Sequence, residues 1–279
     1  MKRFLALVVT IFAILFSCGS IGIVSVSAST SDATGVTWIL TQSALQSMAT
    51  SSTALATLAK GRVIELVPLG SSPFRPGGVS VTPAFTVDSV VTLRSLIQNN
   101  AVPSWAHAVL FDDEAWSLTP LSEQLYPAKA AAWAEQLAGS RGLSLWCAPA
   151  IDLVSVLDPS ASSDWQGYLN LNLAGQMGRS CNGLDIQAQS LERNAATYRK
   201  FVDQASQQAR AARSGIALTA GLSTNPPGPT VTLSELEADV TATIATTHGY
   251  WLNIPSPGPW CPTCAPADPT LGIKLLSWL

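Results

Sequence analysis

Three polar side chains alternate with apolar ones in the segment Asn182–Gln189. Alternate side chains of a β-strand point to opposite faces, so the pattern predicts a strand with Asp185, Gln187 and Gln189 on one face. Three buried polar groups in a row are costly unless they hydrogen-bond to one another or to a ligand. The segment therefore indicates a polar site, with one carboxyl group and two amides, at the end of a buried strand.

The acidic triplet Asp112-Asp113-Glu114 is the second candidate for chemistry. Asp112 and Glu114 share one face of a predicted strand end, so their carboxyl groups could converge. Close carboxyl groups raise each other's pKa, and one of them can then stay protonated at neutral pH. An acid beside a base is what glycoside hydrolysis requires, so we predict Asp112, Glu114 and Asp185 as catalytic residues. The alternative is that the triplet caps the next segment or pairs with an arginine.

Other polar and aromatic residues near predicted strand ends are candidates for holding a ligand. Side-chain amides suit sugar hydroxyls because they both donate and accept hydrogen bonds, and aromatic rings stack on sugar rings. Each candidate also has a structural interpretation, as an ion-pair partner, a helix cap, a turn residue or a core tryptophan. The predicted ligand-binding residues are Glu65, Trp116, Asp152, Gln187, Gln189, Asn225, Trp251 and Asn253.

Short apolar runs alternate with helical stretches along the chain, which predicts a parallel sheet. The expected strands are Thr37–Leu40, Arg62–Leu69, Ala108–Asp112, Leu143–Ala148, Gly183–Gln187, Ala217–Gly221 and Tyr250–Ile254. The expected helices are Ser43–Ala59, Thr86–Asn99, Pro127–Gly139, Asn194–Arg213 and Leu233–Thr246. An eighth strand lies within Leu153–Asn172 or is missing, and the Pro- and Gly-rich stretch Gly70–Pro83 is expected to be a long loop.

These elements favour a (β/α)8 TIM-type barrel, complete or imperfect, whose strand ends open onto a mouth where such enzymes keep their chemistry. A doubly wound parallel sheet is the alternative. The first predicted strand is not followed by a Gly-x-Gly-x-x-Gly motif, which argues against a nucleotide-binding version of that sheet. We predict a single barrel domain over residues 29–279.

Residues 1–28 have the pattern of a secretory signal peptide. Lys2 and Arg3 precede the apolar stretch Phe4–Phe16, and Val26-Ser27-Ala28 resembles a small-residue cleavage site. The pattern predicts a secreted protein, with a surface-anchored membrane protein as the alternative. Any membrane contact would then be through this segment.

The cysteines that follow the signal segment predict disulfides, which export favours. Cys261 and Cys264 are expected to form a local disulfide rather than a redox pair or half of a zinc site. A zinc site is disfavoured because no second Cys-x-x-Cys is present, and a metal centre is not predicted. The sequence leaves open whether Cys147 and Cys181 form a second bridge.

The charge pattern bears on partners and cofactors. The formal net charge of −3 becomes −5 when the two basic residues of the signal segment are removed, and no basic run follows, which argues against nucleic acid as a partner. No phosphate loop or dinucleotide motif is present, so no cofactor is predicted, although carboxylates alone could hold calcium. The expected partner is a carbohydrate or another small polar ligand, and the oligomeric state is left open.

The segment Asn182–Gln189 resembles the strand motif of family 18 glycoside hydrolases, the chitinase-like enzymes, whose pattern is Asp-Gly-x-Asp-x-Asp-x-Glu. Gly183 and Asp185 match that pattern. Gln189 stands where the family has its catalytic acid, and Gln187 stands where it has a supporting aspartate. An amide cannot act as a general acid, so the resemblance implies that this mechanism is lost here.

A broader resemblance covers most of the chain after the signal segment. The runs Leu110–Pro120, Asp185–Gln189 and Gly249–Pro255 look like a group of exported bacterial proteins. This resemblance implies an exported barrel-like domain, and it supplies neither a reaction nor catalytic residues.

Three functions are consistent with these patterns. The first is an exported glycoside hydrolase-like enzyme that uses carboxyl acid/base chemistry. The second is a glycan-binding barrel without catalysis, which the two glutamines favour because they keep hydrogen bonds while removing acids. The third is a structural or envelope-associated protein whose polar lumen is satisfied internally, and it predicts that no open pocket is present.

Overall fold

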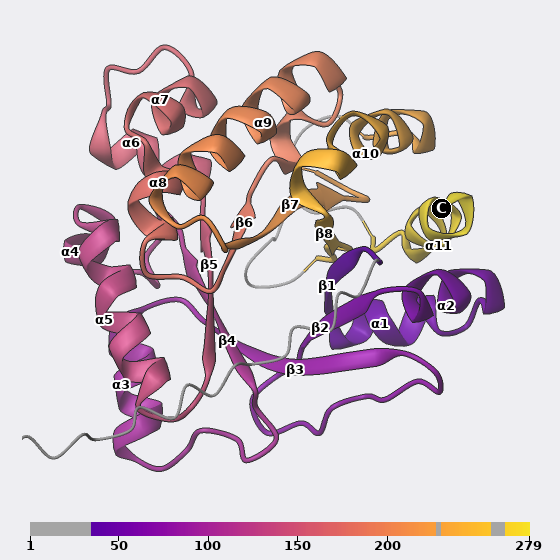
Figure 1. The fold of residues 1–279 in the computed structure, drawn as a ribbon, viewed down its shortest axis with the longest axis horizontal. Helices are drawn as coiled ribbons and strands as arrows, with labels where there is room; N and C mark the ends of the chain where they lie inside the picture. The colour runs from indigo at the N-terminus through magenta and orange to yellow at the C-terminus, as the bar shows by residue number, and fades with distance from the viewer. Residues whose placement is uncertain (1–34, 227–229, 258–265) are drawn as a thin grey trace, which may run out of the picture. The chain divides into compact units, whose positions relative to one another are not determined.

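The computed structural model describes residues 35–226, 230–257 and 266–279. Eight parallel strands close into a barrel in which each strand pairs with its neighbour in sequence and β1 pairs with β8 (Figure 1). The strands are β1 (Thr37–Thr41), β2 (Arg62–Leu66), β3 (Ser80–Val87), β4 (Ala108–Asp113), β5 (Ser144–Pro149), β6 (Gly183–Ile186), β7 (Ala217–Ser223) and β8 (Gly249–Asn253). The predicted (β/α)8 barrel is therefore confirmed, and the doubly wound alternative is wrong.

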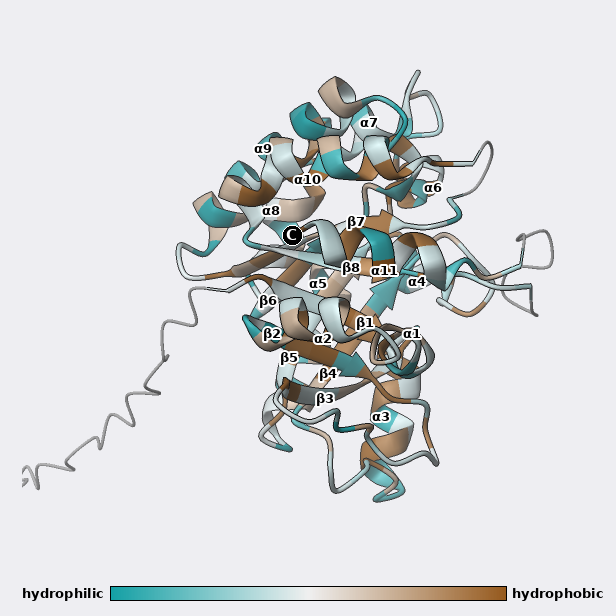
Figure 2. Cartoon of the chain, turned by 90° about the vertical axis from the view of Figure 1, so that its right-hand side faces the viewer, coloured by the Kyte–Doolittle hydropathy of each residue, from teal (hydrophilic) through white to brown (hydrophobic). Residues whose placement is uncertain are grey.

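Helices alternate with the strands and cover the outside of the barrel. They are α1 (Gln42–Met48), α2 (Ser52–Ala59), α3 (Val90–Gln98), α4 (Leu121–Gln124), α5 (Pro127–Gly139), α6 (Val154–Leu157), α7 (Asp164–Asn170), α8 (Leu173–Gly178), α9 (Ala195–Ala212), α10 (Leu233–Thr247) and α11 (Pro269–Trp278). Hydrophobic residues are concentrated on the strands, and the helices carry hydrophilic residues as well (Figure 2). Among the described residues, none of the helices combines the length and the apolar character needed to span a membrane.

Local sequence signals explain several helix boundaries. Pro127 lies in the first turn of α5, where its missing N–H costs no hydrogen bond. Thr232 and Glu235 form a capping box at the start of α10. The single helix expected over residues 43–59 is instead two helices, because Ser51 accepts a hydrogen bond from the backbone N–H of Ala54 and caps α2.

The eighth strand is β3, which lies where the sequence predicted a loop and the start of a helix. The alternative location, Leu153–Asn172, is helical or turn, and the second strand ends at Leu66 rather than Leu69. Pro83 concealed β3, since proline has no N–H to donate to a sheet. In the barrel Pro83 lies opposite Glu65, and its carbonyl still accepts a hydrogen bond from the N–H of His107 at 3.0 Å.

Two apolar layers hold the barrel together. The larger layer lies between strands and helices and includes Trp38, Phe85 and Phe111. The smaller layer fills the lumen with Ile39, Ile64, Leu66, Ala84, Ala108, Leu110, Trp146, Ala148 and Trp251. The Trp146 ring needs the space beside Gly183, because a Cβ atom on that glycine would come within 2.4 Å of the ring. Apolar side chains thus fill the lumen between the two ends of the barrel.

A disulfide joins Cys147 on β5 to Cys181, which directly precedes β6, with a Cα–Cα distance of 5.9 Å. Both cysteines are fully buried in the outer apolar layer. The bridge that the sequence left open is therefore present. The other predicted pair, Cys261 and Cys264, lies outside the described residues.

Replacing both Cys147 and Cys181 with alanine is expected to lower the free energy of unfolding by about 3–4 kcal/mol. The bridge closes a loop of 34 residues, and a cross-link of that span reduces the entropy of the unfolded chain by roughly this amount. Urea unfolding of the domain and the double variant measures the difference. Peptide mapping without reductant should yield a linked Cys147–Cys181 peptide, and free thiols at both positions would contradict the assignment.

Candidate active site

Polar side chains enter the lumen at the C-terminal ends of β4 and β6. Leu110 lies in the lumen, so strand alternation puts Asp112, two residues later, on the same face. Asp112 lines a pocket at this end of the barrel together with Trp251 of β8. Asp185 of β6 accepts a hydrogen bond from Thr219 of β7. Positions far apart in the sequence therefore meet at one mouth.

Asp112 and Gln187 are in direct contact. The Gln187 amide nitrogen donates to Asp112 Oδ1 at 2.9 Å and to the carbonyl oxygen of Ala148 at 2.8 Å. These two hydrogen bonds fix the orientation of the amide and hold the Asp112 carboxyl group beside the end of β5. The structure thus brings together a predicted catalytic residue and a predicted ligand-binding residue.

Asp185 lies deeper than Asp112 and is fully buried. Its Oδ1 accepts a hydrogen bond from the Thr219 hydroxyl at 2.7 Å, and its Oδ2 has no hydrogen-bond partner among the described residues. Burial raises the pKa of Asp185 to about 7, and the bond from Thr219 opposes part of that rise. Because solvent does not reach it, Asp185 is not placed to contact a ligand directly. Its charge instead raises the pKa of Asp112.

The carboxyl groups of Asp112 and Glu114 are partly exposed at the mouth. Burial raises the pKa of Glu114 to about 7, and the nearby charge of Asp152 adds to the effect. Burial also raises the pKa of Asp112 well above its ordinary value, with further contributions from Glu114 and Asp185. All three shifts favour the protonated form, so a mouth carboxyl group holds its proton to higher pH than an ordinary one, which suits a general acid.

The mouth pocket has a volume of about 490 Å³. Its lining residues are Thr41, Gln42, Ser43, Gln46, Leu66, Val67, Pro68, Leu69, Thr86, Asp112 and Trp251. Hydroxyl and amide groups share this lining with an apolar wall and an indole ring. The indole N–H of Trp251 is buried and has no hydrogen-bond partner among the described residues, so it is the ring of this residue, and not its N–H, that the pocket can offer to a ligand.

Glu65, which was predicted to hold a ligand at the strand ends, does not face the lumen. Ile64 and Leu66 occupy the lumen, and alternation turns Glu65 outward. Its carboxylate accepts hydrogen bonds from the Gln42 amide at 3.0 Å and from the N–H of Phe74 at 2.8 Å. Glu65 thus fastens the loop between β2 and β3, and it does so without the arginine that the structural interpretation expected.

Glu65→Ala is expected to lower the free energy of unfolding by about 1–3 kcal/mol, because it leaves the partly buried N–H of Phe74 without its acceptor. Glu65→Gln keeps an acceptor oxygen and should cost less. Urea unfolding of the three proteins measures both effects. An alanine variant as stable as the parent would show that the loop is held by other contacts.

Two predicted residues lie in loops at the mouth. Asp152 is exposed after β5, and its Oδ1 accepts a hydrogen bond from the N–H of Ala115 at 3.1 Å. Trp116 follows β4, and its indole N–H donates to the Thr119 hydroxyl at 2.9 Å. Neither residue is in the lining of the mouth pocket, and Asp152 acts on the site through its charge near Glu114.

The remaining predicted residues are Gln189 after β6, Asn225 after β7 and Asn253, the last residue of β8. The Gln189 side chain covers Gly221, where an added Cβ would come within 2.4 Å of the amide carbon. The N–H of Asn225 donates to the Ser223 hydroxyl at 3.1 Å, and the carbonyl oxygen of Asn253 accepts from the N–H of Thr224 at 3.0 Å. They share the mouth end of the barrel but do not line its pocket.

Thr86 and Gln42 line the mouth pocket although the sequence analysis did not select them. Thr86 was missed because β3 was not recognised. Gln42 directly follows β1, and its position after a strand was the available signal.

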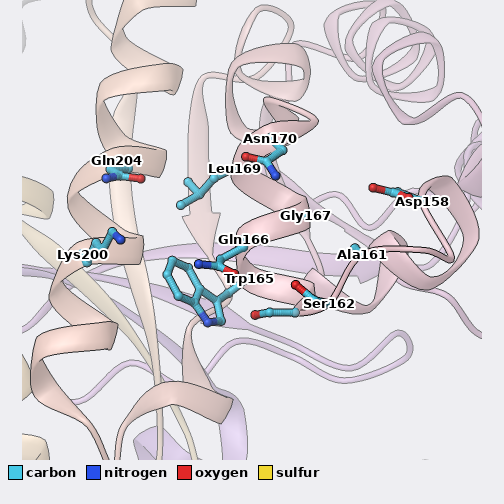
Figure 3. A pocket seen from close by; sticks show the side chains of 11 residues that line it. Asp158, Ala161, Ser162, Trp165, Gln166, Gly167, Leu169, Asn170, Lys200 and Gln204 are labelled. Atoms are coloured by element: carbon cyan, nitrogen blue, oxygen red, sulfur yellow. The ribbon is translucent and has the colours of Figure 1, made fainter.

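A second pocket, of about 320 Å³, lies outside the barrel on α7 and α9 (Figure 3). Its lining includes Trp165, and the Lys200 ammonium group lies 5.4 Å from the centre of that ring. None of the predicted site residues belongs to this pocket.

No protein-family model matches this chain, and no curated protein matches it. Among solved structures, the carboxyl transferase domain of Rhizobium etli pyruvate carboxylase aligns with a TM-score of 0.44 and 10% identity over 88% of this chain. The chain spans only 46% of that protein. Triosephosphate isomerase from Bartonella henselae gives a TM-score of 0.39 and 11% identity, covering 78% of this chain and 92% of the isomerase. Malate synthase from Haloferax volcanii aligns with a TM-score of 0.40 and 12% identity. The alignment covers 88% of this chain and 75% of the synthase. We draw no functional conclusion from these likenesses.

Proposed function

We propose that this protein is an exported glycoside hydrolase-like enzyme that cleaves a carbohydrate by carboxyl acid/base chemistry. The observation that supports the proposal most is the presence of Asp112, Glu114 and Asp185 at the mouth end of β4 and β6, where burial raises the pKa of each and the charges of Glu114 and Asp185 add to the rise at Asp112. Such a cluster supplies an acid and a base at the same pH, as glycoside hydrolysis demands.

Glu114 is the proposed general acid, since it is partly exposed and its pKa of about 7 leaves it substantially protonated at neutral pH. It donates its proton to the glycosidic oxygen as the bond from that oxygen to the anomeric carbon breaks. Asp112 would stabilise the positive charge that develops on the sugar ring in its ionised form, which the hydrogen bond from the Gln187 amide favours against the effect of burial. Water adds to the anomeric carbon, and the proton that it releases returns to the carboxyl pair.

Other groups would position the sugar. Gln187 holds Asp112 by a hydrogen bond, and Trp251 offers an aromatic wall. Gln189 stands where the family 18 hydrolases have their acid, so the proposal assigns the proton donor to Glu114 instead. Asp185, held by Thr219, supports the site through its effect on the pKa of Asp112.

Hydrolysis of a broad panel of oligo- and polysaccharides by the purified domain tests the proposal, with release of reducing ends as the readout. Turnover of any member supports it. Absence of turnover across chitin-like, bacterial and plant-type glycans would reject the hydrolase in favour of the second candidate.

The second candidate is a non-catalytic glycan-binding barrel. The observation that favours it is the pair of amides, Gln187 and Gln189, at positions where a hydrolase of the resembled family would carry acids. It predicts glycan binding without turnover. The third hypothesis, a self-satisfied structural barrel, predicted no open pocket, and the mouth pocket of about 490 Å³ weighs against it.

Export is part of the proposal. The buried Cys147–Cys181 disulfide is compatible with an oxidising compartment and supports it. The signal segment, residues 1–28, lies outside the described residues.

A further inference from the structure

The pocket between α7 and α9 is separate from the barrel mouth. Its volume of about 320 Å³ is within the usual range of small-molecule sites, roughly 300–1,000 Å³. It shares no lining residue with the mouth pocket. Lys200 and Gln204 come from α9 on one side, and Trp165, Gln166 and Asn170 come from α7 on the other (Figure 3). The pocket is therefore a second concave site, built from side chains that the mouth does not use.

The polar groups of this pocket are not engaged within the protein. The side-chain amides of Gln166, Asn170 and Gln204 have no hydrogen-bond partner among the described residues. The hydroxyl of Ser163, at the position that precedes α7, makes no capping hydrogen bond. An amide or a hydroxyl can both donate and accept, so four such groups around one pocket can bind a ligand that carries several hydroxyls.

An indole ring and an ammonium group complete the lining. Trp165 is half-buried and packs against the outer apolar layer, so its ring is held in place. The Lys200 ammonium group lies 5.4 Å from the centre of that ring. The neighbouring Arg199 pairs with Asp203 at 3.3 Å, whereas Lys200 pairs with no carboxylate in the ranges that the structure describes. The pocket thus offers an aromatic surface with a free hydrogen-bond donor beside it.

The charges of the pocket balance. Among its described lining residues, Lys200 is the cation and Asp158 is the anion. Asp158 Oδ1 accepts hydrogen bonds from the N–H and the hydroxyl of Ser160, at 3.2 Å and 2.7 Å, and these bonds hold the loop before α7. The other Asp158 oxygen has no partner among the described residues and can accept. A lining with donors and acceptors but no net charge suits a neutral polar ligand better than an ion.

The backbone around the pocket is closely packed. Gly167 lines the pocket, and a Cβ atom on it would come within 2.4 Å of Val154 Cγ1, so α7 lies directly against α6. The indole, the fixed loop and this tight contact give the pocket its shape before a ligand arrives, which lowers the entropic cost of binding.

We propose that the pocket between α7 and α9 is a second carbohydrate-binding site, which holds a neutral sugar outside the barrel. The sugar ring lies against the Trp165 indole. Lys200 donates to its hydroxyls, and the amides of Gln166, Asn170 and Gln204 donate and accept. Binding here needs no chemistry at the mouth, so the inference goes beyond the hydrolase proposed above.

Calorimetric titration of the purified domain with cellohexaose, maltohexaose, xylohexaose and mannohexaose tests the proposal. We expect at least one of these neutral glycans to bind, and Trp165→Ala to weaken its binding at least about tenfold through loss of the aromatic surface. Oligogalacturonate and glucosamine oligosaccharides, which are charged, should bind more weakly than that glycan. Absence of binding by all four neutral probes overturns the proposal.

A matched pair of residues on α5 provides the control. The Lys129 ammonium group lies 4.7 Å from the centre of the Trp133 ring, and neither residue lines the pocket. Trp133→Ala should leave binding unchanged. Equal loss in Trp133→Ala and Trp165→Ala would mean that exposed indoles bind the glycan without a specific site, which overturns the proposal.

Two exposed residues keep the test valid if Trp165→Ala does not fold. Lys200→Ala and Gln204→Ala remove side chains that contribute to the pocket but are exposed, so the core should be unaffected. Each should weaken binding severalfold, whereas Lys129→Ala should not. Unchanged binding in both α9 variants overturns the proposal.

The outcomes separate this inference from the proposed hydrolase. Release of reducing ends from the hexasaccharides reports on the mouth, and binding that depends on Trp165 reports on the pocket. Binding that depends on Trp165 without turnover supports the inference and counts against the hydrolase. Turnover with binding that no pocket variant changes supports the hydrolase and overturns the inference.

Discussion

Glu114→Gln is expected to lower kcat for glycan hydrolysis by about 10²–10⁴-fold, the usual contribution of a general acid. The amide has nearly the same shape as the carboxyl group but has no proton to donate. Because Glu114 is partly exposed at the mouth, the substitution should not disturb the core. Steady-state kinetics on a glycan that the parent cleaves would measure the loss.

Glu135→Gln on the outer surface of α5 is the matched control, since it makes the same chemical change at an exposed position. Circular dichroism and thermal unfolding should show that both variants fold like the parent. If folded Glu114→Gln retained full turnover, Glu114 would not be the acid, and Asp112 would become the next residue to replace.

Stability is expected to fall as the pH rises from about 4 to about 7. Burial raises the pKa of Asp113 and Asp185 to about 7 and that of Asp239 to about 8. In the unfolded chain these groups lose their protons near pH 4. Between these values the folded protein binds more protons than the unfolded chain, so the free energy of unfolding decreases with rising pH.

Within this window, each such group lowers the free energy of unfolding by up to about 1.4 kcal/mol for each unit that the pH rises. The contribution of each group is fully favourable below about pH 4, and it is lost once the pH exceeds the pKa of the folded state. Urea unfolding at pH 5, 6, 7 and 8 should therefore show a net loss of at least about 2 kcal/mol between pH 5 and pH 7. Greater stability at pH 8 than at pH 5 would contradict these assignments.

Asp185→Asn isolates one of these groups. Asparagine keeps an oxygen that accepts the hydrogen bond from Thr219 but cannot ionise. The variant should be more stable than the parent at pH 8. Between pH 4 and pH 7, its free energy of unfolding should fall less steeply with pH than that of the parent, and the two slopes should differ by about 1 kcal/mol per pH unit. A variant with the parent's slope would show that Asp185 is not the titrating group.

The alternation of apolar and helical stretches was enough to predict the barrel. The helix Pro127–Gly139 was predicted with its observed bounds, and the strand predicted at Ala108–Asp112 extends by one residue. Both carry strong local signals, a proline in the first helical turn and a continuous run of apolar residues. The strand at Ser80–Val87 carries no such signal, because Pro83 and the Gly/Pro-rich stretch before it are typical of a loop. Its pairing with β2 and β4 makes it a strand.

The face of each strand that enters the lumen could not be read from the sequence everywhere. Strands of a parallel barrel are buried on both faces, so apolar residues occur at both parities. Glu65 shows the consequence, since it was predicted to hold a ligand, whereas barrel closure puts its neighbours Ile64 and Leu66 in the lumen. Where polar residues occupied one parity, as at Asp185 and Gln187, the interpretation agreed with the observed contacts.

The amino-acid sequence alone determined the order of strands and helices and the presence of carboxyl and amide groups near strand ends, because these follow from periodicity and residue type. Only the closed barrel decided which groups meet. Asp112 and Gln187 are 75 residues apart in the chain, and their hydrogen bond exists because β4, β5 and β6 lie side by side. The same packing pairs Cys147 with Cys181 and removes Asp185 from water, and this burial is the physical cause of its raised pKa.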